Sequence, residues 1–227
     1  MGGNMNGVSL LPTMPSSPPE SFPMSLPDGF VHARETVPDL HESMDYAGPH
    51  NFTGRPVPGY ARGVVVLTRE AASALAKAQK AAIERGLRFK VFDAYRPQRA
   101  VDEFLRWIHA QDDARLKALY YPQVDKSELF AAGYLAERSA HSRGSTLDLT
   151  LCDEGGRELD MGTRFDFFGP ESWPGSDAVT AEQKANRRLL ADIMVAAGFH
   201  EPHPQEWWHF TLRDEPYPDT WFDFPVV

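Results

Sequence analysis

Two stretches of the chain alternate apolar and polar residues with the two-residue period of a β-strand. In residues 146–152, Leu147, Leu149 and Leu151 alternate with Thr146, Asp148 and Thr150. In residues 207–212, Trp207, His209 and Thr211 alternate with Trp208, Phe210 and Leu212. Because successive strand side chains point to opposite faces, each stretch predicts a strand with one apolar and one functional face. We expect Trp208 in the core and Trp207 lining a cleft.

A strand, a helix and a second strand are predicted between residues 63 and 93. Residues 63–67 form a short apolar run typical of a buried strand, and Thr68 follows as a helix N-cap. Apolar residues then recur at helical spacing: Ala71, Ala72, Leu75, Ala78, Ala82 and Ile83. Gly86 favours the end of this helix, and residues 87–93 alternate as a half-buried strand.

Two further helices are expected. After Pro97, apolar residues again follow helical spacing at Val101, Phe104, Leu105 and Ile108. Thr180 and Gln183 form a capping box, and Gly198 ends the helix that follows. Strands mixed with helices without a regular strand–helix repeat predict a single α+β domain, with a small, mainly antiparallel sheet flanked by helices.

Composition divides the chain into a tail and one domain. Six prolines fall within the first thirty residues, which predicts a flexible N-terminal tail over residues 1–30 and a catalytic domain over 31–227. The net charge of −9, without a basic run, makes nucleic acid an unlikely partner. No apolar run is long enough to insert into a membrane.

The sequence gives only limited information about the cellular compartment of the protein. The single cysteine, Cys152, excludes a disulfide framework or a thiolate zinc cluster within one chain. The first residues lack the basic start and apolar run of a secretory signal. We expect a cytoplasmic protein, or a periplasmic one if a signal peptide has been removed. The oligomeric state is left open.

A metal site is predicted around His141 and His209. Gly144 permits a turn that brings His141 toward Asp148 on the strand that follows. His209 lies on the second alternating stretch. Two histidines and one aspartate suit a zinc ion that keeps its fourth position for water.

Two more residues are expected to take part in chemistry at this site. In a strand Glu206 and His209 would point to opposite faces, so Glu206 is expected in the preceding loop, as a general base rather than a ligand. Arg96 follows a strand and precedes Pro97, which gives its guanidinium a rigid mount for stabilising an oxyanion. A structural ion pair between Arg96 and Asp93 is the alternative. His200 and His203 are weaker ligand candidates.

The pattern Ser-x-His-x-x-Gly-x-x-x-Asp, which begins at Ser139, and the Glu-x-x-His pattern, which begins at Glu206, resemble the VanX-type D-alanyl-D-alanine dipeptidases. Further similar segments are residues 51–57, 95–97, 161–166 and 213–218. The resemblance runs from about Leu40 to the C-terminus. It implies one zinc ion per chain, held by His141, Asp148 and His209, with Glu206 as the base and Arg96 stabilising the transition state.

The resemblance also implies a substrate. It assigns the substrate ammonium group to Asp166, with Ser139 and Tyr46 helping to hold a free D,D-dipeptide, D-alanyl-D-alanine from the peptidoglycan cell wall. Asp166 as a plain loop residue is the alternative. Thr146 stands where this family usually has alanine, which puts the detail of the pocket in question.

Two other functions stay open at this stage. One is a D,D-carboxypeptidase or murein endopeptidase that acts on longer peptides with a similar metal set. The other is a zinc-dependent peptide-binding module without catalysis, against which the joint presence of Glu206 and Arg96 argues.

Overall fold

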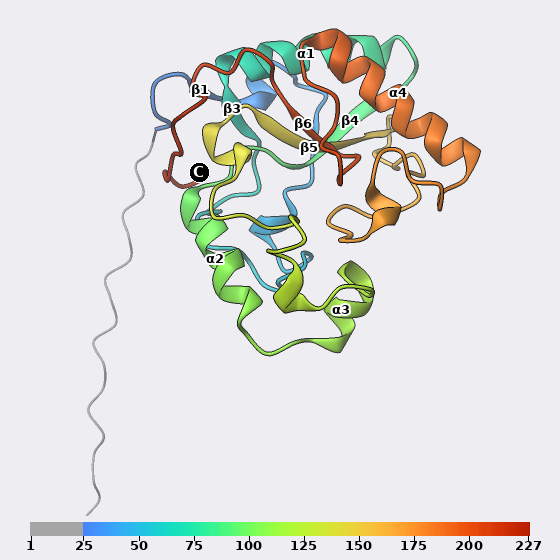
Figure 1. Ribbon diagram of the computed structural model, residues 1–227. Helices are drawn as coiled ribbons and strands as arrows, with labels where there is room; N and C mark the ends of the chain where they lie inside the picture. Colours follow the sequence, from blue (N-terminus) through green and yellow to red (C-terminus); the bar gives the residue numbers. More distant parts are fainter. Residues whose placement is uncertain (1–24) are drawn as a thin grey trace, which may run out of the picture.

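The computed structural model describes residues 25–227, and Figure 1 shows the arrangement of its helices and strands. The helices of this part of the chain are α1 (Arg69–Ile83), α2 (Gln98–Ile108), α3 (Ala114–Tyr120) and α4 (Ala181–Ala197). Its strands are β1 (Phe30–His32), β2 (His41–Glu42), β3 (Val66–Thr68), β4 (Arg88–Asp93), β5 (Thr146–Cys152) and β6 (His209–Thr211).

The main sheet has four strands in the order β2-β4-β5-β6. Strands β4, β5 and β6 pair antiparallel, and β2 joins β4 in parallel. A second, two-stranded antiparallel sheet consists of β1 and β3. This mixture of helices with a mainly antiparallel sheet confirms the predicted α+β class.

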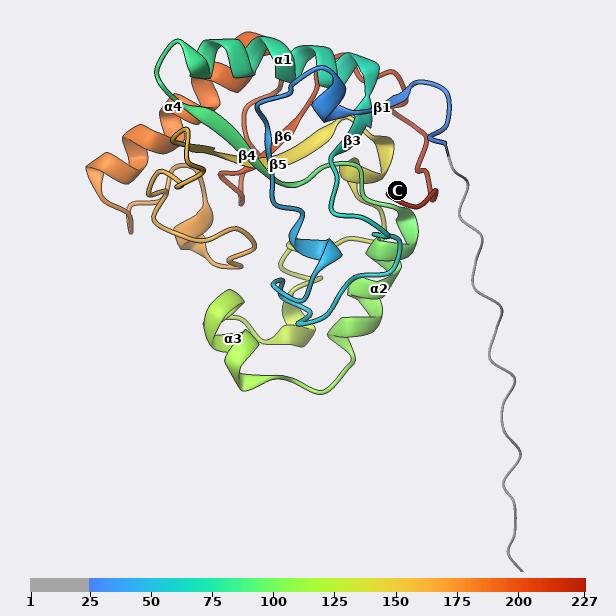
Figure 2. The ribbon, with the colours of Figure 1, turned by 180° about the vertical axis from the view of Figure 1, so that it is seen from behind.

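Helices lie on both sides of the main sheet, but of the described helices only α1 and α4 lie directly against it. α1 and α4 pack together over one side, while α2 and α3 lie on the other, as both views show. Figure 2 shows β5 and β4 running beneath α1 from behind. All seven residues of β5 are buried, so the predicted alternation of leucines with polar residues places Thr146, Asp148 and Thr150 on a buried polar face.

Local signals set the helix ends where the sequence predicts them. The Thr68 side chain accepts the Ala71 N–H at the start of α1, and α4 begins with the complete Thr180–Gln183 capping box. Gly198 ends α4 with a φ of +115°, a conformation that favours glycine. These caps confirm the expectations for both helices.

Other boundaries differ from the sequence-based expectation. β6 begins only at His209, because residues 207 and 208 form a turn, so this strand is shorter than residues 207–212. α3 was not predicted, and it starts where the Asp113 side chain accepts the N–H groups of Arg115 and Leu116. Residues 1–24 of the predicted tail lie outside the described residues, whereas Phe30 is buried in β1.

The C-terminal segment that follows β6 packs against the start of α2 and the turn that precedes β5. The Phe222 N–H donates to the Ser142 carbonyl oxygen, and the Gln98 N–H donates to the Phe222 carbonyl oxygen. Val226 forms a parallel bridge with Tyr60. This segment therefore ties the start of α2 to the turn that precedes β5. Among residues 25–227, no helix has the length and apolar character needed to cross a bilayer.

Candidate active site

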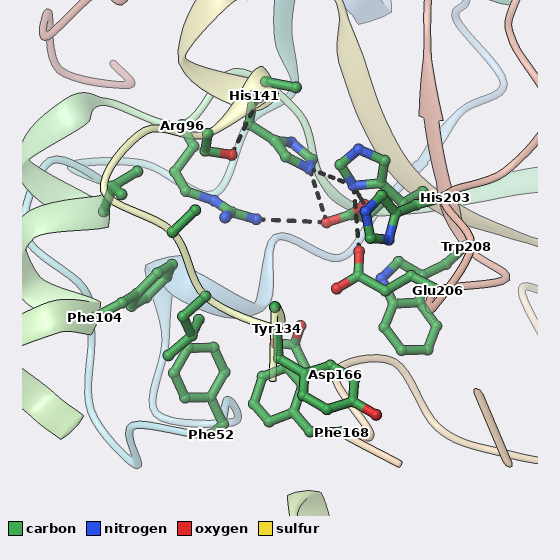
Figure 3. A pocket seen from close by; sticks show the side chains of 18 of the residues that line it. Phe52, Arg96, Phe104, Tyr134, His141, Asp166, Phe168, His203, Glu206 and Trp208 are labelled. Carbon is green, nitrogen blue, oxygen red and sulfur yellow. Dashed lines mark hydrogen bonds and ion pairs between the residues drawn. The ribbon is translucent and has the colours of Figure 1, made fainter. Parts of the chain in front are cut away.

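Three side chains that can ligate a metal converge on the polar face of β5 and β6 (Figure 3). His141 Nε2 lies 3.1 Å from Asp148 Oδ2 and 3.2 Å from His209 Nδ1, and Asp148 Oδ1 lies 3.1 Å from His209 Nδ1. One ligand atom from each residue lies within 4.8 Å of the others. Asp148 and His209 are direct partners in the β5–β6 ladder, so the sheet itself brings them together.

A 3-10 turn, Ala140–Arg143, positions His141 just before β5. The Ser139 hydroxyl oxygen accepts the His141 N–H at 3.2 Å and caps this turn. His141 Nδ1 lies 2.7 Å from the Ala94 carbonyl oxygen, which can only accept a hydrogen bond, so Nδ1 carries the proton. The lone pair of Nε2 therefore points into the site, as is typical of metal-ligating histidines.

Gly144 ends the turn with a φ of +83°, as the sequence predicts. A Cβ atom at this position would lie 2.3 Å from Cε1 of Phe30. Both the backbone conformation and the close approach of Phe30 therefore require glycine between His141 and Asp148.

The pKa shifts of Asp148 and His141 favour the forms of these two residues that bind a cation. Burial disfavours the charged form of Asp148, but the charges and hydrogen bonds of His141 and His209 outweigh burial and hold its pKa below the usual range. Burial lowers the pKa of His141, which favours the neutral imidazole, although the charge of Asp148 opposes this. Asp148 Oδ1 is buried and lies 3.1 Å from His209 Nδ1, but the two atoms are not aligned for a hydrogen bond, so this oxygen has no hydrogen-bond donor among the described residues. An anionic carboxylate with an unused oxygen beside two imidazoles fits a metal ion.

Glu206 lies beside this group but outside it. It occupies the loop before β6, where its Oε2 is 3.4 Å from His209 Nδ1. Burial raises the pKa of Glu206 to about 7, although the charge of His209 opposes the rise. A carboxyl group whose pKa lies near neutrality is suited to taking up and releasing a proton.

Arg96 approaches the group from the side opposite Glu206 (Figure 3). Its Nε lies 2.8 Å from Asp93 Oδ2 and its Nη2 lies 3.5 Å from Asp148 Oδ2. The guanidinium carbon lies 5.1 Å from the ring centroid of Tyr46 and 5.2 Å from that of Phe104. The ion pair with Asp93 is therefore present, and it holds the guanidinium at the wall of the cavity.

A cavity of about 180 Å³ opens between this group and α2. Much of its wall is apolar and consists of Phe52, Val101, Phe104, Tyr134, Leu135, Phe168 and Trp208. Pockets for drug-sized ligands typically measure about 300–1,000 Å³, so this cavity suits a very small molecule.

Asp166 and Tyr46 provide a polar end to the cavity. The Tyr46 hydroxyl donates to Asp166 Oδ2 at 2.8 Å, and both side chains are buried. Burial and the charge of Asp148 raise the pKa of Asp166, while the hydrogen bond from Tyr46 opposes that rise. Asp166 also has a φ of +59°, in a turn. Ser139 lines the same cavity.

Both tryptophans are buried in the core, as expected for Trp208, but Trp207 does not line the cavity as predicted. Trp208 lines the cavity, whereas Trp207 packs away from it and donates from Nε1 to the Thr163 hydroxyl at 2.8 Å. The alternation predicted for residues 207–212 fails here because the strand begins only at His209.

His203 is a cavity residue that the sequence analysis gave little weight. Its ring centroid lies 5.5 Å from that of His209, and its N–H donates to the His209 carbonyl oxygen. His203 stays outside the group of possible metal ligands, as expected. No spacing in the sequence indicates that the loop from Pro202 to Pro204 folds back onto His209.

Thr146 does not line the cavity. Its hydroxyl lies 2.9 Å from the hydroxyl of Thr211, its partner on β6. Any effect of Thr146 on the pocket would therefore be indirect, because its side chain is hydrogen-bonded to the neighbouring strand.

Comparison with known proteins extends over nearly the whole described chain. Residues 27–227 match the family described as D-ala-D-ala dipeptidase. A D-alanyl-D-alanine dipeptidase of Streptomyces coelicolor is 45% identical over 199 residues, which cover 87% of this chain and 98% of the relative. One of Enterococcus faecium is 42% identical, with the same coverage. One of Escherichia coli is 36% identical over 175 residues, covering 77% of this chain and 80% of the relative.

Proposed function

The chain belongs to the D-ala-D-ala dipeptidase family, and from this premise we propose that it hydrolyses D-alanyl-D-alanine to two D-alanines with one zinc ion. His141, Asp148 and His209 would hold the zinc ion. The observation that carries the proposal is the convergence of these three residues beside Glu206 at one end of a small cavity.

The donor set and its surroundings support a catalytic zinc centre. Two imidazole nitrogens and one carboxylate are a usual set for catalytic zinc, which leaves one position open to water or substrate. The metal would supply a Lewis acid that polarises the scissile carbonyl and lowers the pKa of water to about 7. The hydrogen bond to the Ala94 carbonyl oxygen keeps the proton of His141 on Nδ1, which leaves Nε2 free to bind the metal ion.

Proton transfer falls to Glu206. Its carboxylate lies next to His209 and faces the cavity, so it can take a proton from the attacking water and pass it to the leaving amine. The pKa of about 7 that burial gives this carboxyl group suits both steps.

Arg96 is placed to stabilise the negative charge that develops on the carbonyl oxygen. Its Nε is engaged by Asp93, which directs the rest of the guanidinium toward Asp148 and the cavity. A preorganised donor of this kind typically contributes about 100- to 1,000-fold in rate.

The shape and charge of the cavity support a free dipeptide as substrate. Asp166, with Tyr46 behind it, offers an acceptor for the ammonium group of the first residue. Ser139 offers a hydroxyl group that can hold the peptide. The aromatic wall around them leaves room for small side chains such as the methyl groups of alanine.

The test is release of free D-alanine by the zinc-loaded protein. We expect cleavage of D-alanyl-D-alanine that a chelator abolishes, with little cleavage of L-alanyl-L-alanine or of a tripeptide ending in D-alanine. Cleavage of the tripeptide at a similar rate would instead identify a carboxypeptidase or endopeptidase. Peptide binding without turnover by zinc-loaded protein would identify a binding module.

A further inference from the structure

β6 carries His209 on a very short strand at the edge of the main sheet. The strand has three residues, and three register pairs join it to β5. A short edge strand is held by fewer interactions than a central strand and opens more readily. The distance between Asp148 on β5 and His209 on β6 therefore depends on how firmly these few pairs are fixed.

One of the three pairs has a side-chain hydrogen bond on the face that carries the ligands. The hydroxyl oxygens of Thr146 and Thr211 lie 2.9 Å apart. Each threonine is two residues from a ligand on its own strand, Thr146 from Asp148 and Thr211 from His209. Since side chains two apart share a face, the hydroxyl pair lies directly beside the ligand pair.

Neither threonine contacts the cavity, so a direct role in binding substrate is excluded for both. Thr146 is fully buried, and its hydroxyl would lose a partner without Thr211. Backbone hydrogen bonds hold the strand on either side: the Leu212 N–H donates to the Ser145 carbonyl oxygen, and the Leu149 N–H donates to the Trp208 carbonyl oxygen. The threonine pair adds a bond between the side chains themselves.

We propose that Thr146 and Thr211 are positioning residues for the metal centre. Their hydrogen bond fixes the register and spacing of β5 and β6, and thereby holds Asp148 and His209 at the separation that a shared metal ion requires. This inference rests on the proposed metal centre, and it assigns a role to a hydroxyl pair that neither binds the metal nor touches the substrate.

The chain offers a matched control. Thr150 is two residues beyond Asp148 on β5, on the same face, and its buried hydroxyl has no hydrogen-bond partner among the described residues. Valine has nearly the shape of threonine without the hydroxyl. Thr146→Val and Thr150→Val therefore make the same chemical change on the same strand, and only the first breaks an interaction with β6.

The test measures the zinc dissociation constant by competition with a chromogenic chelator, in wild type and in each variant. Because a net hydrogen bond is worth roughly fivefold in an equilibrium constant, we expect Thr146→Val and Thr211→Val each to weaken zinc binding about fivefold. The double variant should bind no more weakly than either single variant, because both remove the same bond. Thr146→Ser should retain wild-type affinity, and Thr150→Val should be unchanged.

Thermal unfolding of the metal-free variants separates positioning from loss of fold. If Thr146→Val and Thr150→Val shift the unfolding temperature alike but only Thr146→Val weakens zinc binding, positioning is supported. Equal zinc affinity in Thr146→Val and wild type, or additive effects in the double variant, would overturn the role of the pair while leaving the metal centre intact. Absence of zinc binding by wild type would overturn the metal centre and this inference with it.

Discussion

The ring of His141 is tied to the end of β4 through one hydrogen bond, from Nδ1 to the carbonyl oxygen of Ala94 at 2.7 Å. Ala94 directly follows β4 and precedes Tyr95 and Arg96, so the same short segment fixes the imidazole and carries the guanidinium. The proposed ligand and the proposed oxyanion donor therefore share one support. Substitutions in this segment are expected to affect both functions together.

Glu206→Gln should remove the base without removing the metal. Glutamine keeps the size of the side chain but takes up no proton, so we expect zinc content near wild type and a fall in kcat of at least about 100- to 10,000-fold. Metal analysis of the purified variant and the rate of D-alanine release are the measurements. Loss of zinc in proportion to activity would show that Glu206 is a ligand.

His209→Ala should lose the metal itself. Two ligands remain, so we expect zinc content to fall to near zero and activity with it. Since a metal that binds only the folded state stabilises it, added zinc should raise the unfolding temperature of wild type but not of this variant. His200→Ala, a change in the neighbouring loop, serves as the control and should respond to zinc as wild type does.

Arg96→Lys should show whether catalysis needs only the positive charge of Arg96 or also the planar shape of its guanidinium group. Lysine keeps the positive charge but lacks the planar fork that reaches Asp93 and the cavity at once. We expect zinc binding to persist and kcat to fall by about 100-fold, with a smaller change in KM. A rise in KM with unchanged kcat would indicate that Arg96 binds the ground state of the substrate instead.

Asp166→Asn should weaken recognition of the free amino end. Asparagine keeps an oxygen that can accept from Tyr46 but cannot carry the negative charge that would pair with an ammonium group, so we expect KM for D-alanyl-D-alanine to rise at least tenfold. Wild type should also discriminate strongly against the N-acetylated dipeptide, and the variant much less. If Asp166→Asn lowers activity equally on the free and the N-acetylated dipeptide, then Asp166 supports the shape of the cavity without contacting the ammonium group.

Asp45→Asn should stabilise the fold in a pH-dependent way. Burial raises the pKa of Asp45 to about 6, above its ordinary value of 3.8, so the folded state holds this proton more tightly than the unfolded chain does. The stability that this proton contributes is present below pH 4 and is lost as pH rises through 6. Unfolding by denaturant should show Asp45→Asn more stable than wild type by on the order of 2 kcal/mol at pH 7.5, with little difference at pH 3.5. An equal gain at both values would indicate improved packing instead.

The sequence predicts the central elements of the site because they depend on local patterns. Alternation in residues 146–152 places Asp148 on the polar face of β5, and Gly144 permits the turn that carries His141. Thr68 and Thr180 mark helix starts through hydrogen bonds within one turn of the chain. Such signals need only a few neighbouring residues, so they can be recognised before the fold is known.

The cavity depends on contacts that no local pattern contains. Phe52, Tyr134 and Phe168 meet around it from separate loops, and His203 joins through a loop that folds onto His209. The position of Trp207 away from the cavity has a similar origin, because a turn replaces the first two residues of the expected strand. In each case packing between distant segments decides the position of the side chain.

The left-handed backbone of Asp166 limits how this position can vary. At a φ of +59°, most side chains are strained, whereas asparagine and glycine are tolerated. Of those two, only asparagine keeps an acceptor for the Tyr46 hydroxyl. A saturation library at codon 166 should therefore yield few well-folded members. To redesign the pocket for a substrate with a different N-terminal group, substitutions should begin at neighbouring residues of the cavity wall, such as Phe168, and not at Asp166.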